Sequence, residues 1–163
     1  MNIKDTADKL VMHSEKEGAK QAEAYVVLAR TSSVYIDDNI PKIADVKVEL
    51  GVNVKFIVDK KIGFTSSTLL NESIEDVVKR AKKLANLSGE DAKFESLPEP
   101  KKVSEKHDKF YDKRTAEISS ERLLEKTMTL VDSTIADGIT VPNGVLRTSS
   151  VDFHVRNSLG VDV

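Results

Sequence analysis

The chain has 163 residues, of which 39% are hydrophobic and 32% are charged, with a formal net charge of −2. This composition is typical of a globular domain and excludes a disordered or membrane-spanning chain. The absence of cysteine excludes disulfides, thiol nucleophiles and thiolate metal sites. The near-neutral charge and the lack of tryptophan argue against a nucleic-acid-binding domain. The first residues lack the apolar segment of a signal peptide, so we expect a soluble cytoplasmic protein.

The first elements predicted are a helix and two short strands. The helix is predicted to end at Gly18. Five of its side chains lie at helical spacing and form one stripe: Ile3, Ala7, Leu10, Val11 and Ser14. Strand-forming runs follow at 22–28 and 34–36, and Asp37-Asp38-Asn39 with Pro41 predicts a turn after them.

Strict alternation of apolar residues marks the next segment, 46–58. A period of two over this length predicts a long strand with one buried face in an antiparallel sheet. Residues 59–61 are expected to close a hairpin, and 62–64 return from it. Gly51 and Gly63 are suited to a bulge or to close approach of another backbone.

A hydroxyl-rich segment, Thr65-Ser66-Ser67-Thr68, then leaves the predicted sheet. Asn71 is expected to cap a strongly amphipathic helix over 74–85. The chain is polar from Gly89 to about Thr115, which predicts a linker or a surface crossover.

The last third is predicted to contain a helix and further strands. The helix starts near Ser119 and ends at Gly138, and strand-like residues follow at 139–141 and 145–146, separated by the turn 142–144. The side chains of Val151, Phe153 and Val155 are expected to point inward. A turn at 157–160 sends residues 161–163 back as the start of a further strand, so we expect that the chain is truncated there.

These elements predict an α+β fold of the α/β class, in which a largely antiparallel sheet packs on amphipathic helices. We expect residues 1–163 to be one domain with three parts: a first helix-strand part (1–88), a linker (89–118) and a second, truncated helix-strand part (119–163). We expect the 151–163 region to self-associate or to be poorly ordered, because most of its outer backbone edge has no partner.

No catalytic, cofactor-binding or metal-binding residues are predicted. His13, His107 and His154 are too far apart in sequence for a zinc motif of the HExxH type, and each is expected at the surface. Residues 65–68 are assigned a capping role rather than that of a nucleophile. Residues 37–39 are assigned to a plain turn rather than to a cation site. Four acidic residues are expected on the solvent face of the linker and the following helix: Asp112, Glu117, Glu121 and Glu125.

Several stretches resemble one family, the TldD/PmbA proteins, also called TldD/TldE and modulators of DNA gyrase. Residues 22–26 and 51–55 match two of its strands, and 59–68 (DKKIGFTSST) are similar to its "DGRxGFASTxxL" motif. Ala81 and Ala85 fit its A-x-x-x-A helix end, 97–100 its "LPxP", and 155–160 its "xNSxG" turn. Lys60 and Lys61 depart from the usual glycine and arginine.

The resemblance implies that this chain is the N-terminal domain of a protein about three times longer. TldD-like members bind zinc through an HExxxH motif and a cysteine in a later region, whereas PmbA/TldE-like members lack those ligands. The resemblance, slightly closer to the second branch, implies a homo- or heterodimer with a TldD/PmbA-type subunit that degrades unfolded or small peptides. Zinc is therefore expected only outside this chain, and the domain is expected to serve assembly and substrate handling. The alternative is a stand-alone protein-binding module, with nucleic acid a weaker choice of partner.

Overall fold

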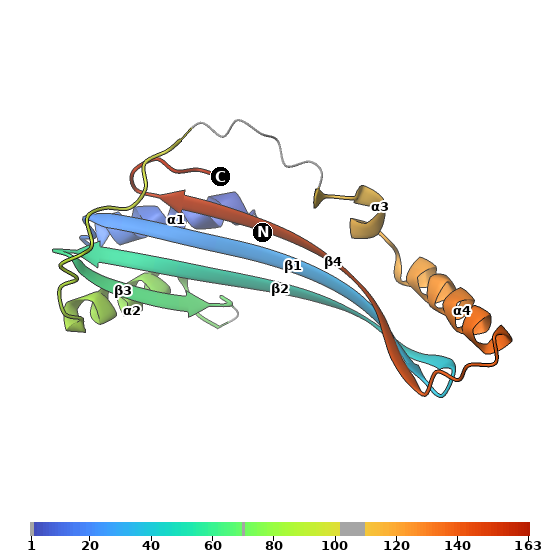
Figure 1. Ribbon diagram of the computed structural model, residues 1–163. Helices are drawn as coiled ribbons and strands as arrows, with labels where there is room; N and C mark the ends of the chain where they lie inside the picture. Colours follow the sequence, from blue (N-terminus) through green and yellow to red (C-terminus); the bar gives the residue numbers. More distant parts are fainter. Residues whose placement is uncertain (1, 70, 102–109) are drawn as a thin grey trace. The chain divides into compact units, whose positions relative to one another are not determined.

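A computed structural model describes residues 2–69, 71–101 and 110–163 (Figure 1). The elements follow in the order α1 (Ile3–Lys16), β1 (Gln21–Asp37), β2 (Ile40–Val58), β3 (Lys61–Ser67), α2 (Ile74–Leu87), α3 (Lys113–Ala116), α4 (Ser120–Ala136) and β4 (Asn143–Asn157). The predicted α+β class is therefore confirmed. None of the described helices is long and apolar enough to cross a membrane.

The four strands form one sheet in the order β3-β2-β1-β4. Two-residue turns with positive φ, Asp38-Asn39 and Asp59-Lys60, connect β1 to β2 and β2 to β3. Such turns fit the right-handed twist of antiparallel hairpins. β4 runs antiparallel to β1, since Ser158 N donates to Ala22 O and Asp38 N donates to Pro142 O, both at 2.9 Å.

The chain divides into two compact units, and the long strands contribute to both. The first unit comprises residues 1–28, 49–104 and 152–163, and the second comprises 29–48 and 105–151.

The core of the first unit lies between α1, α2 and one face of the strands. Val52, Val54 and Phe56 are each 1% exposed, as the alternation in this part of β2 predicts. They pack with Ala22, Ala24 and Val26 of β1 and with the apolar stripes of both helices. A Cβ placed on Gly63 would lie 1.9 Å from Ala81 O, so α2 passes directly over this glycine. The predicted close backbone approach at Gly63 is confirmed.

The second unit is built on α4. Its buried side chains Leu123, Thr127 and Val131 form one stripe, and Val34 and Ile36 of β1 are also buried in this unit. Ser119 caps the helix by accepting a hydrogen bond from Arg122 N, close to the predicted start.

Several predicted elements differ from the structure. Residues 22–28 and 34–36 belong to one strand, because β1 is an inner strand whose backbone finds partners in both β2 and β4. β4 is likewise continuous, and 139–141 form no strand. Residues 113–116 within the predicted linker form the short helix α3. Ser73 caps α2 in place of Asn71, because Asp76 lies three residues after it and completes a capping box.

Two predicted buried faces are also wrong. Val46 and Val48 are 43% and 58% exposed, because they lie outside the core of the first unit, to which β2 contributes from Leu50 onward. Val151 and Phe153 are exposed as well. Within the second unit, Leu146 and Thr148 of β4 lie beside α4.

The end of the chain returns along β4, as the turn at 157–160 predicts. Val155 and Val163 exchange backbone hydrogen bonds of 2.7 and 3.0 Å, and Asn157 N donates to Val161 O. The Asn157 side chain is fully buried and accepts from Leu159 N and Val161 N. One amide side chain thus fixes this turn.

Candidate functional site

The histidines lie in separate places. His13 on α1 lies 3.3 Å from Glu75 of α2, and His154 on β4 lies 2.8 Å from Asp162 Oδ1. The predicted surface position of His154 is wrong, since its side chain is only 13% exposed. His107 lies outside the described residues. In the described ranges, no three His, Asp or Glu side chains are grouped to hold a metal ion.

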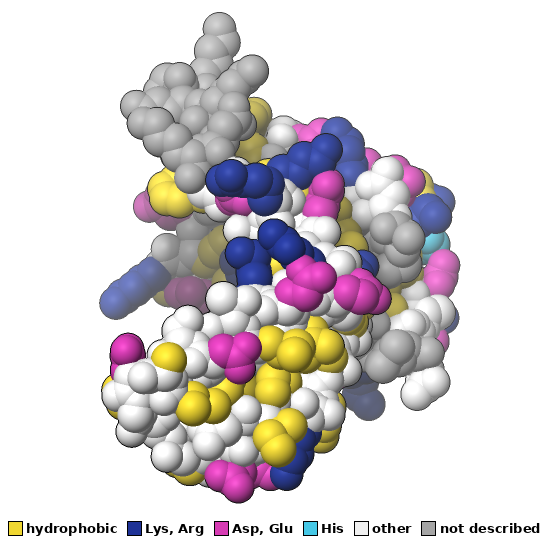
Figure 2. Space-filling view, turned by 90° about the vertical axis from the view of Figure 1, so that its right-hand side faces the viewer, with side chains coloured by type: hydrophobic (Ala, Val, Ile, Leu, Met, Phe, Trp, Pro, Cys, Tyr) yellow, Lys and Arg dark blue, Asp and Glu magenta, His cyan; other side chains and the backbone are white. Residues whose placement is uncertain are grey.

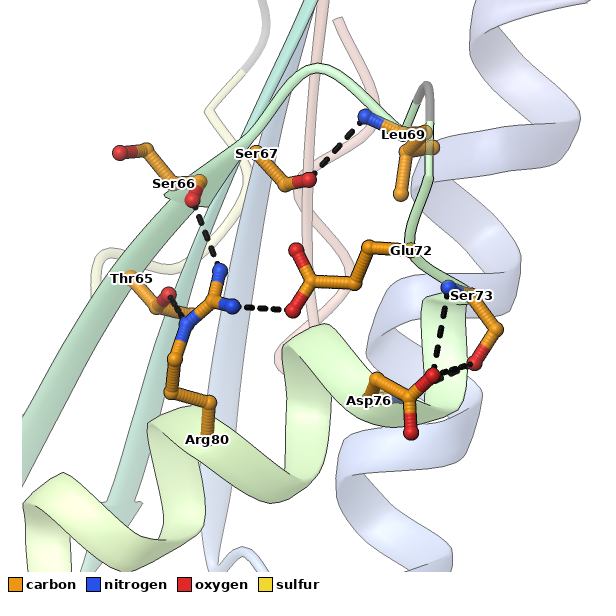
Figure 3. Close-up of polar contacts among 8 residues, drawn as sticks. All are labelled: Thr65, Ser66, Ser67, Leu69, Glu72, Ser73, Asp76 and Arg80. Carbon is orange, nitrogen blue, oxygen red and sulfur yellow. Dashed lines mark hydrogen bonds and ion pairs between the residues drawn. The ribbon is translucent and has the colours of Figure 1, made fainter.

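The hydroxyl-rich segment is held by Arg80 of α2 (Figure 3). Its Nε donates to Thr65 Oγ1 at 2.8 Å, and a terminal nitrogen donates to Ser66 O at 2.9 Å. The other terminal nitrogen pairs with Glu72. Arg80 therefore ties the end of β3 and the loop before α2 to the helix, which is a structural role.

The start of α2 completes this network. Ser73 Oγ accepts from Asp76 N at 3.1 Å and donates to the Asp76 carboxylate at 2.7 Å. This hydrogen bond from Ser73 holds the pKa of Asp76 below its ordinary value. Ser67 Oγ accepts from Leu69 N at 3.0 Å, where Leu69 has a φ of +55° (Figure 3).

The turn 37–39 has the predicted turn role. Asp37 pairs with Lys42 across the hairpin and raises its pKa. Asn39 Oδ1 accepts from Val141 N at 2.7 Å, so the turn fastens the segment before β4.

The four acidic residues of the linker and α4 make local contacts. Asp112 caps α3 by accepting from Thr115 N at 2.8 Å, which lowers the pKa of Asp112. Glu125 lies 2.6 Å from Arg122 on the same helix, and Glu117 lies 3.9 Å from Lys113. The pKa of Glu121 is lowered by a hydrogen bond with its own backbone at the start of α4.

An aromatic surface that sequence reasoning missed lies in the first unit. Tyr25, Phe64 and Phe153 are 36%, 55% and 58% exposed, and the rings of Tyr25 and Phe153 stack with centroids 6.1 Å apart. Tyr25 and Phe64 border a small cavity of about 210 Å³, together with the Glu23–Lys55 ion pair and Asn53. Tyr25 has the opposite phase to the buried Ala24, whereas the alternation of the sequence placed Phe64 and Phe153 on buried faces, and both are exposed.

The second unit exposes a different apolar surface. Residues 42–48 of β2 are all exposed, and β3 pairs with β2 only from Val52 to Val58 among the described residues. Ile43, Val46 and Val48 lie in this part and are 61%, 43% and 58% exposed. Figure 2 shows hydrophobic side chains gathered in the lower part of one view of the surface. Exposed apolar groups along a strand are typical of surfaces that contact another protein.

Comparisons with known proteins agree with this architecture. Residues 22–85 match the family model of the PmbA/TldA metallopeptidase domain 1, from the start of β1 to the last turn of α2. Residues 22–85 thus resemble the first domain of the TldD/PmbA family. The predicted resemblance is confirmed in its motifs at 22–26, 51–55 and 59–68, which all lie in the matched range.

Solved structures of similar fold extend the match to nearly the whole chain. The crystal structure of TldE from Thermococcus kodakarensis has a TM-score of 0.81 and 26% identity, and the match covers 97% of this chain and 36% of that one. A protein described as a modulator of DNA gyrase from Thermotoga maritima has a TM-score of 0.80 at 18% identity. That match covers 99% of this chain and 36% of the other, and it shows the fold alone.

A curated relative from Methanocaldococcus jannaschii, described as an uncharacterized protein, is 30% identical over 156 residues. That alignment covers 96% of this chain and 35% of the relative. The chain thus spans about a third of the length of the relatives that it matches.

Proposed function

We propose that this chain is the assembly and substrate-handling domain of a TldD/PmbA-type, metallopeptidase-related protein that degrades or matures peptides. The observation that carries the proposal is the match of 22–85 to the first domain of a metallopeptidase family. The similarity to TldE over 97% of the chain supports a position in the PmbA/TldE-like branch. We place the protein in the cytoplasm.

The surfaces support an assembly role. Tyr25, Phe64 and Phe153 present aromatic area in the first unit, and the strand surface around Val46 presents apolar area in the second. Aromatic side chains are enriched where proteins contact each other. The proposed partner is a TldD/PmbA-type subunit, in a homo- or heterodimer, and the proposed substrates of the full assembly are unfolded or small peptides.

Catalysis is assigned to other parts of the assembly. A zinc peptidase needs three protein ligands that leave one coordination position open. The described residues do not fit zinc, because they contain no group of three His, Asp or Glu side chains at such a site. We therefore propose that zinc, where the assembly uses it, is bound by residues outside this chain.

The proposal is tested by measuring assembly and peptidase activity together. The purified chain is mixed with a TldD-type subunit, and the mass of the species is measured by light scattering after size-exclusion chromatography. We expect a defined complex, with cleavage of an unfolded peptide by the complex and none by the chain alone. Metal-dependent cleavage by the chain alone that survives contaminant controls would overturn the non-catalytic assignment.

The same experiment separates the alternative of a stand-alone protein-binding module. The exposed strand surface of the second unit favours this alternative, since it requires only a protein partner. A chain that stays apart from every TldD/PmbA-type subunit while binding an unrelated protein stoichiometrically would establish it and refute the assembly proposal.

Removal of metal provides an independent check. Thermal unfolding of the chain is followed by circular dichroism with and without a chelator. We expect the same midpoint in both, because no three His, Asp or Glu side chains of the described ranges are grouped to hold an ion. A fall of several degrees would show that the chain itself binds a metal.

A further inference from the structure

The part of β2 that precedes its pairing with β3 has an open backbone edge. β2 lies between β3 and β1 in the sheet, but its register with β3 begins at Val52, which lies opposite Ser67. Over residues 41–51, no other described strand pairs with that edge of β2. Figure 1 shows β3 as a short strand beside only one part of the longer β2. An open edge of this length offers unpaired N–H and C=O groups to another strand.

The side chains along this open edge are exposed, and several of them are apolar. Ile43, Val46 and Val48 are 61%, 43% and 58% exposed, and every residue from 42 to 48 lies at the surface. Successive side chains of a strand point to opposite faces, so both faces of this part of β2 are accessible. A strand added at this edge would pair the backbone groups and cover part of the apolar side chains at the same time.

The charges of this segment favour a second copy of the same strand as the occupant. Asp45 and Lys47 stand on either side of Val46. In an antiparallel pair centred on Val46, a two-fold axis passes between the two copies of this valine and sets Asp45 of each copy opposite Lys47 of the other. The pair therefore contains two contacts between opposite charges, and such contacts stabilise neighbouring strands.

Two other arrangements of the same strands are unfavourable because like charges meet. An antiparallel pair centred on Lys47 would set the two lysines opposite each other and Asp45 opposite Glu49. A parallel pair in register would stack each charged residue on its own copy. The charge pattern therefore selects against both arrangements.

The length of the open edge decides between the remaining registers. A pair centred on Val48 would use only residues 45–51, because Val52 is already paired with Ser67. A pair centred on Val46 uses the whole of 41–51. The register centred on Val46 therefore forms the larger number of backbone hydrogen bonds.

The two charged side chains are able to make these contacts. Asp45 has no ion pair among the described residues. Lys47 already has an interaction within its own chain. Its ammonium group carries three donors, so it can bind the carboxylate of another copy in addition.

We propose that two copies of this chain associate through the open edge of β2, as an antiparallel pair centred on Val46 in which Asp45 of each copy binds Lys47 of the other. This inference rests on the proposed function, because it gives the homodimeric form of the assembly an interface. A two-fold pair uses the same surface on both copies, so it closes on itself and leaves this edge unavailable for further growth.

Sedimentation velocity of the full chain over a range of concentrations tests the association. We expect a monomer–dimer equilibrium. D45K and K47D should each weaken dimerisation at least roughly tenfold, since either change places two pairs of like charges at the interface. The double variant D45K/K47D should restore the wild-type dissociation constant, because it exchanges the two charges, and circular dichroism confirms that each variant is folded. A monomeric wild type at millimolar concentration, single variants that dimerise as well as the wild type, or a double variant as weak as the single ones overturns the proposal.

Single cysteines locate the two-fold axis, since the chain contains no cysteine of its own. Opposite residues of an antiparallel pair have Cα atoms about 4.5–5.5 Å apart, within the range of a disulfide. V46C should therefore form a disulfide-linked dimer under mild oxidation, whereas V48C should not, because Ala44 of the other copy lies opposite it. K83C, at an exposed position of α2, controls for chance collisions. Cross-linking of V48C in preference to V46C, or equal cross-linking of all three, overturns the register.

The outcomes separate this interface from the function on which it rests. A chain that dimerises through another surface overturns the β2 pair and leaves the assembly role standing. A chain that neither dimerises nor binds a TldD/PmbA-type subunit overturns both.

Discussion

At the scale of single residues, the contribution of a side chain to the free energy of unfolding depends on how tightly it is packed, as Phe56 illustrates. Phe56 is 1% exposed and lies in the core of the first unit, so Phe56→Ala should lower the unfolding free energy by about 3–5 kcal/mol. Lys55 is the control, since it is the next residue and its ion pair with Glu23 is partly exposed. Lys55→Ala should change stability by about 0.5 kcal/mol or less. Urea denaturation of both variants checks the pair, and equal losses would contradict the one-sided core.

Substitution of Gly63 is a second change whose effect on stability the packing predicts. The Cβ of an alanine there would meet Ala81 O at 1.9 Å and Ala85 N at 2.4 Å, and backbone atoms cannot rotate away. Gly63→Ala should cost at least about 2 kcal/mol, because α2 must shift off the sheet. Gly89→Ala is the matched control, because nothing lies within 4 Å of its added Cβ. Thermal midpoints of the two variants should differ by many degrees, and similar midpoints would show that α2 does not pack as described.

At the scale of elements, the capping box of α2 makes stability depend on pH. The Ser73 side chain lowers the pKa of Asp76, so ionised Asp76 stabilises the folded state. This contribution is complete above the unfolded pKa of about 4 and disappears as the pH falls through the lower folded value. Asp76→Asn should therefore destabilise the chain near neutral pH, and the difference from wild type should shrink below about pH 4. The urea midpoints of both proteins across this pH range measure the stability difference. A difference that does not change with pH would exclude the capping carboxylate as its cause.

The elements also show what the sequence can and cannot reveal. The stripes of α1 and α2, the alternation over 52–58 and the glycine at 63 are local patterns, and each predicted its element or contact correctly. The faces of Val46 and Phe153 were misassigned, because burial there depends on which strand residues a distant helix covers. The capping box at Ser73 was readable as Ser followed by Asp three residues later, but Asn71 offered a competing cap.

The candidate surfaces were less predictable than the fold. One cavity of the second unit brings Arg122 and Lys126 next to Leu146 and Thr148, which lie some twenty residues further along the chain. The aromatic surface joins Tyr25, Phe64 and Phe153 across strands β1, β3 and β4 in the same way. Such juxtapositions require the strand order, which periodicity alone does not supply.

At the scale of the whole molecule, the two units differ in how much apolar surface they bury. Most of the buried hydrophobic residues of the described chain belong to the first unit, whereas Val34, Ile36, Leu123 and Val131 are those of the second. Local opening costs less free energy where fewer apolar contacts are lost. The backbone of the second unit should therefore open before that of the first.

Hydrogen exchange followed by mass spectrometry tests this expectation on the free chain. Amides of Val52–Phe56, in the core of the first unit, should be the last to exchange, and those of Val34–Ile36 should exchange faster although both lie in long strands of the same sheet. Leu123→Ala provides the matched perturbation: it should speed exchange at Val34–Ile36 while leaving Val52–Phe56 unchanged, provided that the two units open independently. Equal acceleration in both would show instead that the chain opens as one cooperative unit.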